Sequence, residues 1–262
     1  MDKLFIIKIG GNVLDNPQAL DKFLTDFASI KAHKILIHGG GKIATKIGDQ
    51  LGIESKYVNG RRITDAQTLD VVTMVYGGLV NKQIVAKLQT LNCNAIGLTG
   101  ADGNLIQATK RPVKEIDYGF VGDVTSSGVH VGLLTLLLNA SAVPVFAPLT
   151  HAAGSILNTN ADTIASVLAI ALSKKFDVRL IFCFEKKGVL CDVNDNTSVI
   201  HHLPKRLYED LLQKQAFADG ILPKLENAYA AIHEGVREVL IGEASDLVTN
   251  TGIETEGTLI TE

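Results

Sequence analysis

The chain alternates short apolar runs with longer amphipathic stretches from one end to the other, and this alternation limits how it can fold. Residues 4–9 form an apolar, β-branched run that is typical of a strand buried on both faces. Further strands are expected at 34–38, 94–98, 143–147, 178–184, 238–241 and 258–260, with a hairpin within 100–129. Helices are expected at 17–31, 41–51, 64–91, 133–138, 160–173, 204–214 and 222–234. This order predicts an α/β fold with a mostly parallel sheet between layers of helices.

Three of the predicted helices have recognisable first residues. Asn16 followed by Pro17 has the pattern of an N-cap with proline in the first turn. The segment from Thr64 to Gln67 has the spacing of a capping box, which predicts that the helix begins there. Asn160 is the expected cap of a third helix.

Composition excludes several kinds of protein. The chain has 25 Lys and Arg against 28 Asp and Glu, a net charge of −3, which is not the basic surface of a nucleic-acid-binding protein. An apolar content of 46% argues against disorder. Neither the first residues nor the most apolar stretch, 129–138, predicts a signal peptide or a membrane span. We therefore expect a cytoplasmic protein with no nucleic-acid or membrane partner.

The three cysteines, Cys93, Cys183 and Cys191, are odd in number and lack the spacing of a metal site. They are expected to be reduced, mostly buried thiols, and no protein-bound metal is expected. No linker, repeat or low-complexity segment divides the chain, although two lobes meeting near 170–180 are compatible with it.

Glycine is in excess, with 24 among 262 residues. Gly10-Gly11 follows the first predicted strand, and Gly39 to Gly41 follows the second. In an open α/β sheet, ligands bind beyond the carboxyl ends of the strands, where glycine lets backbone N–H groups approach an anion. Two such turns on neighbouring strands predict an anion cradle, although each alone is equally well explained as a tight turn.

Three known loop types compete for the second glycine turn. Residues 39–44 match the dinucleotide-binding pattern, but no acidic residue ends a strand about 20 residues later. Residues 38–41 resemble the oxyanion loop of hydrolases, but the chain has no G-x-S-x-G nucleophile elbow. A Walker A motif is also absent. A phosphate or carboxylate cradle of another kind remains.

Two lysines occupy positions that are costly for a cation. Lys8 lies near the carboxyl end of the first apolar strand, and burying its ammonium is unfavourable unless an anion is near. Lys224 lies at the start of a predicted helix, where the helix dipole opposes a cation. Each lysine fits a role in meeting a bound anion, and each also fits a solvent-exposed side chain.

Polar residues at two other places suggest the same kind of site. Asn158, Asn160 and Asp162 alternate ahead of a helix, so they either face one site together or serve as capping residues. Arg62 follows the Asn59-Gly60 turn, and its guanidinium suits either a substrate carboxylate or an exposed surface.

Taken together, these segments resemble the amino acid kinase family. The matching segments, in chain order, are residues 8–11, 38–41, 59–64, 158–162 and 223–224, and the resemblance continues to 257–260. Each short motif is common, but their ordered combination is specific. The segments around Arg62 and Asn158 resemble those of members that act on an acylated glutamate, rather than aspartate, uridylate or carbamate kinases.

The resemblance implies an open three-layer αβα sandwich with about eight mainly parallel strands. It implies one domain, 1–262, in which the lobe 1–175 binds an N-acyl-glutamate and the lobe 176–262 binds ATP. The implied reaction moves the γ-phosphoryl group of MgATP to the side-chain carboxylate of N-acetyl-L-glutamate, the second step of arginine biosynthesis. Mg²⁺ is expected to be held mainly by the nucleotide phosphates.

The resemblance also implies roles for individual residues. Lys8 and Lys224 would flank the transferred group, and Asp162 would hold both ammonium groups in place. The residues expected at the substrate are Gly40, Gly41, Arg62 and Asn158, and those expected at the phosphoryl groups or the nucleotide are Gly10, Gly11, Glu185, Lys186 and Gly188. A carboxylate nucleophile is ionised at neutral pH, so no general base is expected.

One segment departs from the family pattern, which usually has Thr/Ser-Asp-Val-x-Gly at the nucleotide. Here residues 184–188 begin with Phe184 and Glu185, so the hydroxyl is lost and the glutamate replaces the aspartate. Gly60, Gly188 and Gly220 are expected at turns beside ligand segments. Arginine-inhibited members carry an extra amino-terminal helix, and a first strand near residue 4 favours a homodimer that arginine does not regulate.

Other functions fit the same residues. The acceptor is alternatively N-succinyl-L-glutamate, with 119–122 as a candidate loop of the acyl pocket. A non-catalytic ligand sensor on the same fold is a second alternative, against which the joint presence of Lys8, Asp162 and Lys224 argues. A dinucleotide-dependent oxidoreductase fits the residues least well.

Overall fold

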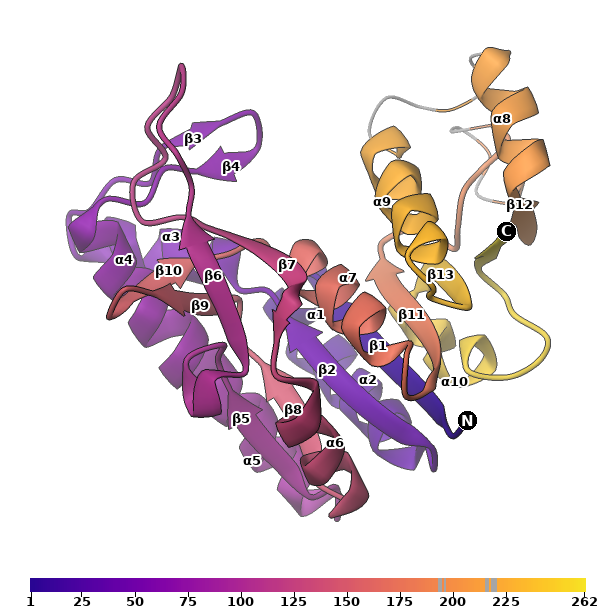
Figure 1. Ribbon diagram of the computed structural model, residues 1–262, viewed down its shortest axis with the longest axis horizontal. Helices are drawn as coiled ribbons and strands as arrows, with labels where there is room; N and C mark the ends of the chain where they lie inside the picture. Colours follow the sequence, from indigo (N-terminus) through magenta and orange to yellow (C-terminus); the bar gives the residue numbers. More distant parts are fainter. Residues whose placement is uncertain (193–194, 196, 215–216, 218–220) are drawn as a thin grey trace.

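The computed structural model describes residues 1–192, 195, 197–214, 217 and 221–262 (Figure 1), and Gly220 lies outside them. The first elements are β1 Lys3–Ile9, α1 Gly11–Asp15, α2 Pro17–Ser29, β2 His33–His38, α3 Gly41–Gln50, β3 Tyr57–Val58, β4 Arg61–Arg62, α4 Ala66–Val72, the π-helix η1 Thr73–Val80 and α5 Asn81–Thr90. Next come β5 Ala95–Leu98, the 3₁₀ turn η2 Asp102–Asn104, β6 Ile106–Lys110, β7 Gly122–Val129, α6 Val131–Asn139, β8 Val143–Phe146, β9 Leu149–Ala152, β10 Ser155–Asn158 and α7 Ala161–Leu172. The last are β11 Asp177–Phe184, β12 His202–Pro204, α8 Lys205–Gln213, α9 Leu222–His233, β13 Glu238–Glu243, the 3₁₀ turn η3 Ala244–Asp246, α10 Leu247–Asn250 and β14 Thr258–Thr261.

An eight-stranded sheet runs through the molecule in the order β12-β14-β13-β11-β1-β2-β8-β5. Its neighbouring strands are parallel, except for the antiparallel pair of β13 and β14. The prediction of an open, mainly parallel sheet of about eight strands is therefore confirmed. Because β1 pairs with β11 along its whole length, one continuous sheet joins the residues before 175 to those after it.

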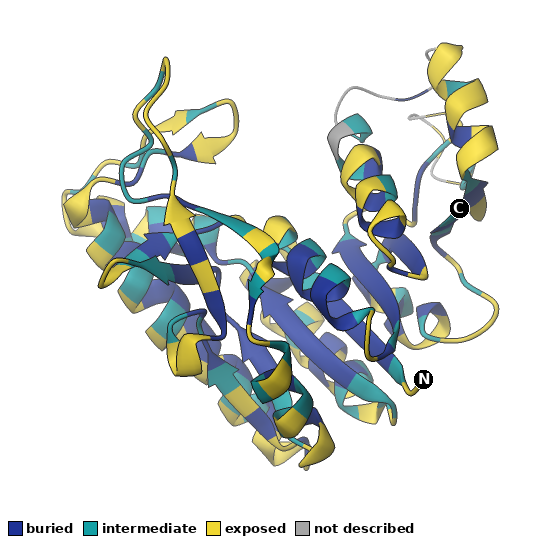
Figure 2. Cartoon of the chain, in the orientation of Figure 1, coloured by how far each residue is buried: buried dark blue, intermediate teal, exposed yellow. Residues whose placement is uncertain are grey.

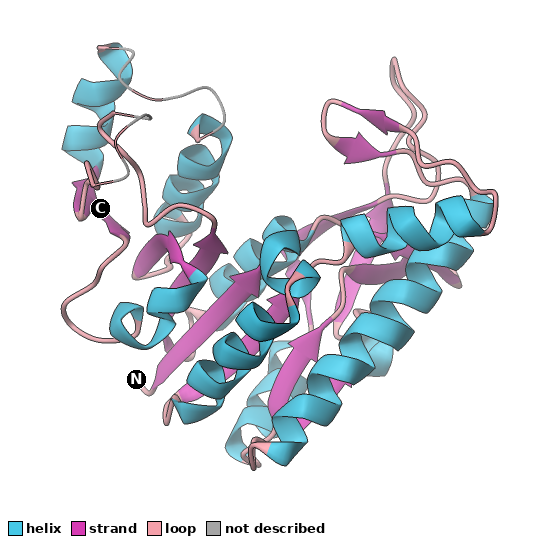
Figure 3. Cartoon of the chain, turned by 180° about the vertical axis from the view of Figure 1, so that it is seen from behind, coloured by secondary structure: helices cyan, strands magenta, loops and turns pink. Residues whose placement is uncertain are grey.

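Helices cover both faces of this sheet, as Figures 2 and 3 show from opposite sides. Side chains alternate between the faces of a strand, so β1 serves two cores. Leu4 and Ile6 pack in one core with residues of α7 and α9, whereas Phe5 and Ile7 pack in the other with residues of α2 and α5. These layers form the αβα sandwich predicted above. None of the described helices combines the length and apolar composition needed to cross a bilayer.

Smaller sheets extend from the part of the chain before residue 175 (Figure 1). β6 and β7 form the predicted antiparallel hairpin within 100–129. The hairpin of β9 and β10 was not predicted, although its turn, Ala153-Gly154, has the left-handed φ angles of 47° and 81° that such turns require. Alanine rarely adopts this conformation, so the residue type conceals the turn.

The predicted helix over 64–91 exists, but it begins one residue later than the capping box implied. The Asp65 side chain, not that of Thr64, accepts the capping hydrogen bond, from the Thr68 amide at 2.8 Å. The Thr64 backbone is instead paired with the loop before β7, since its N–H donates to Tyr118 and its carbonyl accepts from Phe120. The middle of the long helix, η1, is a π-helix, a form often found at functional sites.

Candidate active site

The carboxyl ends of β1 and β11 bring Lys8 and Phe184 to one face of the central sheet. Lys8 is in register with Phe182, and residues two apart on a strand share a face. This face belongs to the core that α7 and α9 cover. The first turns of these two helices carry Asp162 and Lys224. One residue from each of β1, β11, α7 and α9 therefore lies at the same end of the sheet.

Lys8 and Asp162 form an ion pair, with Nζ 2.8 Å from Oδ1. The Lys8 side chain is only 12% exposed and that of Asp162 is 30% exposed. Asn160 caps α7 by accepting a 2.9 Å hydrogen bond from the Thr163 amide, which places Asp162 in the first turn. The helix dipole favours a carboxylate there, so local helix structure and the charge on β1 both stabilise it.

Lys224 approaches the same place from α9. Its Nζ lies 3.4 Å from the centroid of the Phe184 ring. Burial lowers the pKa of this ammonium, as does the charge of Lys8, while the negative charges of Asp162 and Glu185 act in the opposite direction. Asp162 was predicted to hold both lysines; in this structure its ion pair is with Lys8.

The second glycine turn requires glycine at Gly40. Its φ of +146° is rarely adopted by other residues, and an added Cβ would lie 2.9 Å from Cδ1 of Tyr76 in the π-helix. The first N–H groups of α3 have no side-chain cap after Gly40. Unpaired amides at a helix N-terminus are suited to binding an anion, and an anion cradle at this turn stays a prediction. Gly10 and Gly11 take the equivalent place after β1, where Gly10 is the N-cap of α1.

The buried side chain of His38 forms hydrogen bonds beneath the second glycine turn. His38 Nδ1 lies 2.7 Å from the Gly39 carbonyl oxygen, and Nε2 lies 3.1 Å from Asn81 Nδ2. Asn81 Nδ2 also donates to the Val145 carbonyl at 2.9 Å, so Nε2 of His38 is an acceptor and Nδ1 carries the proton. Burial lowers the pKa of His38 to about 4, which keeps the ring neutral.

A pocket of about 230 Å³ opens between this turn, the β3–β4 hairpin and the start of α7. Its lining includes the four residues predicted at the substrate, Gly40, Gly41, Arg62 and Asn158, and also Arg61 and Arg111. It extends to Ala161, the first residue of α7, and the next residue, Asp162, carries the carboxylate that pairs with Lys8. The charged residues of its lining, Arg61, Arg62 and Arg111, are all positive.

Arg62 is buried and held rigidly. Its guanidinium donates to Ser55 Oγ, to the Gly41 carbonyl at 2.8 Å and to Thr45 Oγ1 at 2.9 Å, and it lies 4.8 Å from the centroid of the Tyr57 ring. An arginine has five N–H donors, so these bonds leave donors for a ligand in the pocket.

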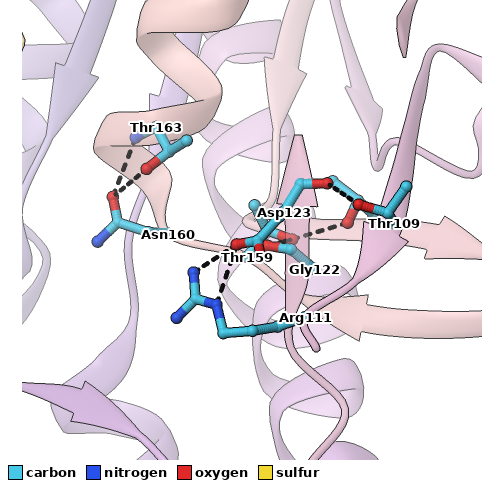
Figure 4. A network of polar contacts seen from close by, with 8 residues as sticks. Thr109, Arg111, Gly122, Asp123, Thr159, Asn160 and Thr163 are labelled. Atoms are coloured by element: carbon cyan, nitrogen blue, oxygen red, sulfur yellow. Dashed lines mark hydrogen bonds and ion pairs between the residues drawn. The ribbon is translucent and has the colours of Figure 1, made fainter. Parts of the chain in front are cut away.

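Asn158 and Arg111 come from the small sheet on the other side of the pocket. Asn158 Nδ2 donates to Thr64 Oγ1 at 3.0 Å. Arg111 is paired with Asp123, to whose Oδ1 its Nε donates at 3.0 Å (Figure 4). The same view shows Asn160 turned toward Thr163 at the start of α7.

The segment predicted to contact the nucleotide begins where β11 ends. Glu185 and Lys186 are exposed there, whereas Gly188 is buried. An added Cβ at Gly188 would lie 2.6 Å from Thr258 Oγ1, so this glycine is required by close packing against β14. Gly188 is thus explained by the fold, and a contact of its backbone with a nucleotide stays a prediction.

Sequence reasoning missed the aromatic residues of the site and Arg111. Tyr57 and Tyr76 line the pocket, and Phe184 contacts Lys224. No motif marks the tyrosines. Phe184 was noted only as a departure from the family pattern, although a large aromatic residue at a strand end beside a lysine-rich site is itself a signal.

The described residues hold no metal cluster, and two of the three cysteines are buried. In the described part of the chain, no three His, Cys, Asp or Glu residues gather as metal ligands would. Cys183 is buried, and burial raises the pKa of its thiol to about 12, so it is a core residue as predicted. Cys93 is also buried, whereas Cys191 is exposed.

Known proteins share both this sequence and this fold. The model of the "Amino acid kinase family" matches residues 3–243. The acetylglutamate kinase of Parabacteroides distasonis is 56% identical over 253 residues, which are 96% of this chain and 98% of that protein. The acetylglutamate kinase of Cytophaga hutchinsonii is 58% identical over 250 residues, 95% of this chain and 94% of that protein.

A solved structure, that of N-acetylglutamate synthase from Neisseria gonorrhoeae complexed with coenzyme A and N-acetyl-glutamate, has a TM-score of 0.82 and 20% identity. It covers 100% of this chain, which spans 59% of that longer chain, and the likeness concerns the fold alone. The family match over nearly the whole sequence, together with the geometry above, leads to one conclusion: the chain belongs to the amino acid kinase family.

Proposed function

We propose that this protein transfers the γ-phosphoryl group of ATP to the side-chain carboxylate of N-acetyl-L-glutamate, a step of arginine biosynthesis. The products are ADP and N-acetyl-L-glutamyl 5-phosphate. The observation that carries the proposal is that Lys8, paired with Asp162, and Lys224 both lie over the Phe184 ring, and that Asp162 follows Ala161, which lines the pocket with Arg62. Relatives that are more than half identical over nearly their full length bear the name acetylglutamate kinase, which supports the same activity here.

The chemistry follows from these charges. A carboxylate oxygen of the substrate forms a new bond to the γ-phosphorus, while the bond from that phosphorus to the bridging oxygen of ADP breaks. Negative charge on the transferred group is the main obstacle, and two ammonium groups, Lys8 and Lys224, are placed to neutralise it. Arg62 binds the α-carboxylate of the substrate, and Asn158 with the backbone of Gly40 and Gly41 orients it.

ATP is expected in association with Mg²⁺. When bound, the ion neutralises charge on the β- and γ-phosphates. Asp162 is a carboxylate of this site that is already paired with Lys8. We therefore propose that the nucleotide phosphates supply most of the ligands of Mg²⁺ and that Gly10, Gly11, Glu185 and Lys186 contact the nucleotide or its phosphoryl groups.

The arrangement of the lobes is part of the same proposal. The lobe 1–175 contains the pocket with Arg62 and binds the acyl-glutamate, and the lobe 176–262 binds ATP. We also propose a homodimer in the cytoplasm, as the family resemblance implies. Light scattering of the purified protein measures the oligomeric state independently of activity.

The activity is tested by incubating the purified protein with MgATP and N-acetyl-L-glutamate and trapping the acyl phosphate with hydroxylamine. Trapped product is expected with N-acetyl-L-glutamate and not with unacylated glutamate. Lys8→Ala and Lys224→Ala should each lower kcat about a hundredfold or more, because each removes a cation from the transferred group. Lys22→Ala, which changes an exposed lysine paired with Asp26, is the control. Tight binding of N-acetyl-L-glutamate with no trapped product would favour the sensor alternative.

N-succinyl-L-glutamate is a second candidate acceptor. Arg61 and Arg111 line the substrate pocket and also an adjoining pocket of about 530 Å³, which Lys114 lines as well. Glu115 and Asp123 line the adjoining pocket too, and Arg111 is paired with Asp123, so Arg61 and Lys114 are the cations that suit an acyl group ending in a second carboxylate. Comparing kcat/KM for the acetyl and succinyl substrates decides between them, and Arg61→Ala should lower only the value for the succinyl compound.

A further inference from the structure

The ring of Phe184, the last residue of β11, faces both lysines of the site. Lys224 Nζ lies 3.4 Å from the ring centroid, and Lys8 Nζ lies 6.0 Å from it. An ammonium within about 6 Å of an aromatic centroid is attracted by the negative face of the ring. Phe182 lies alongside, with centroids 6.2 Å apart and ring planes inclined by 29°, so the packed core supports Phe184 from the sheet side.

Among the described residues, Lys224 forms no ion pair. Across residues 1–192, 195, 197–214, 217 and 221–262, no carboxylate oxygen lies within 4.0 Å of its Nζ. Asp162 is engaged by Lys8 at 2.8 Å. Lys224 also lies in the first turn of α9, where the helix dipole opposes its charge. A partly buried ammonium without a counter-ion needs another source of stabilisation, and the ring is the contact the structure provides.

A ring and a carboxylate hold a lysine with different consequences. A carboxylate partner would cancel the positive charge and compete with a phosphoryl oxygen for the same N–H donors. An aromatic face attracts the ammonium through its quadrupole and carries no net charge. The Phe184 ring therefore leaves the N–H donors and the positive charge of Lys224 available to the transferred group.

We propose that Phe184 is a positioning residue for phosphoryl transfer, and that its ring holds the Lys224 ammonium in place while leaving its charge uncompensated. The inference rests on the proposed function. Its contribution should appear in kcat, because the transferred group gains negative charge at the transition state, rather than in KM for the acyl-glutamate, which binds at Arg62.

The kinetic test compares two variants at Phe184. Phe184→Leu keeps an apolar side chain beside Phe182 but removes the ring, and it should lower kcat about tenfold with little change in KM for N-acetyl-L-glutamate. Phe184→Tyr keeps the ring and should retain kcat near that of the wild type. Phe5→Leu is the matched control, because it removes another ring that a lysine contacts, Lys3 at 5.1 Å, on the opposite face of β1.

A pH profile separates the ring from simple packing. The ring stabilises the protonated ammonium against burial and against the charge of Lys8, alongside the charges of Asp162 and Glu185. Removing the ring should therefore lower the pKa of Lys224 further and move the alkaline limb of kcat to lower pH. The limb should stay in place in Phe184→Tyr.

A spectroscopic readout tests the contact without relying on turnover. Protons on the ε-carbon of a lysine above a ring face are shifted upfield by the ring current. Lys3, Lys34 and Lys110 also lie over rings, so in NMR spectra of protein labelled with ¹³C-lysine the Lys224 signal is assigned by its absence from Lys224→Arg. It should lie upfield in the wild type and move downfield in Phe184→Leu. If the wild type makes no acyl phosphate but shows this signal, the proposed function fails while the contact stands.

Two results would overturn the inference. One is a Phe184→Leu enzyme with the kcat and the alkaline limb of the wild type. The other is a Phe184→Tyr enzyme as impaired as Phe184→Leu, which would mean that the exact shape of the phenylalanine matters and not its aromatic face.

Discussion

The Lys8 ammonium lies 2.8 Å from the Asp162 carboxylate and joins the central strand of the sheet to the first turn of α7. The two residues are separated by more than half of the chain, yet each is placed by its own element. Strand alternation directs Lys8 to the face covered by α7, and the Asn160 cap fixes where α7 begins. The pair therefore joins the end of β1, where the first glycine turn begins, to α7, whose first residue lines the pocket.

Replacing Asp162 with asparagine tests this coupling. Asp162→Asn should lower kcat about a hundredfold, because the Lys8 ammonium loses the carboxylate that orients it toward the transferred group. The hydroxylamine assay measures the effect. Asp21→Asn removes an exposed carboxylate paired with Lys87 and should leave kcat unchanged. An Asp162→Asn enzyme as fast as the wild type would show that Lys8 is oriented by other groups.

Replacing Arg62 with lysine tests substrate binding. Arg62→Lys should raise KM for N-acetyl-L-glutamate about tenfold or more, because a lysine cannot make the present hydrogen bonds and also contact a carboxylate bidentately. Initial rates over a range of substrate concentrations give KM, and a thermal melt shows whether the fold is retained. The control is Arg237→Lys, at an exposed arginine paired with Asp177. An unchanged KM would place the α-carboxylate elsewhere.

Adding a methyl group at Gly40 tests the turn. Gly40→Ala should lower the free energy of unfolding by about 1–3 kcal/mol, because the φ angle of +146° is strained for alanine and the new Cβ meets the Tyr76 ring. Urea titration measures this change. Gly41→Ala is a control for stability alone, since its Cβ would meet no atom within 4 Å and its φ is not left-handed. Equal losses in the two variants would contradict the stated cause.

The buried His38 predicts a pH dependence of stability. Its pKa is about 4 in the folded protein and near 6.5 when unfolded, so the unfolded chain binds the proton more readily. The free energy of unfolding should therefore fall as the pH drops below about 6.5 and stop falling from this cause below about 4, a loss of about 3 kcal/mol.

Urea titrations between pH 7.5 and 4.5 on the wild type and His38→Gln measure this contribution. In His38→Gln the free energy of unfolding should lack the part of its fall with pH that His38 causes, even if this variant is less stable at every pH. His201→Gln, at an exposed histidine, should keep the slope of the wild type. Parallel curves for wild type and His38→Gln would mean that the ring is not the group that titrates.

Local signals predicted most of the framework correctly. The apolar run before Gly10, the Asn16 cap of α2 and the Asn160 cap of α7 act within a few residues, so each could be recognised without knowing its surroundings. The prediction that Thr64 caps the long helix was wrong. A distant loop pairs with the Thr64 backbone, and Asp65 is the cap instead. Local patterns failed where a contact from far along the chain competed with them.

The sequence by itself determined the class of fold, the main strands and helices of the central sandwich, and the charged residues that mark an anion site. Only the tertiary structure decided which of those residues meet: Asp162 with Lys8, Lys224 with the Phe184 ring, and Arg62 with Ser55 and Thr45. Secondary structure depends on neighbours within one or two turns of chain, whereas these contacts join elements whose relative positions the packed sheet alone defines.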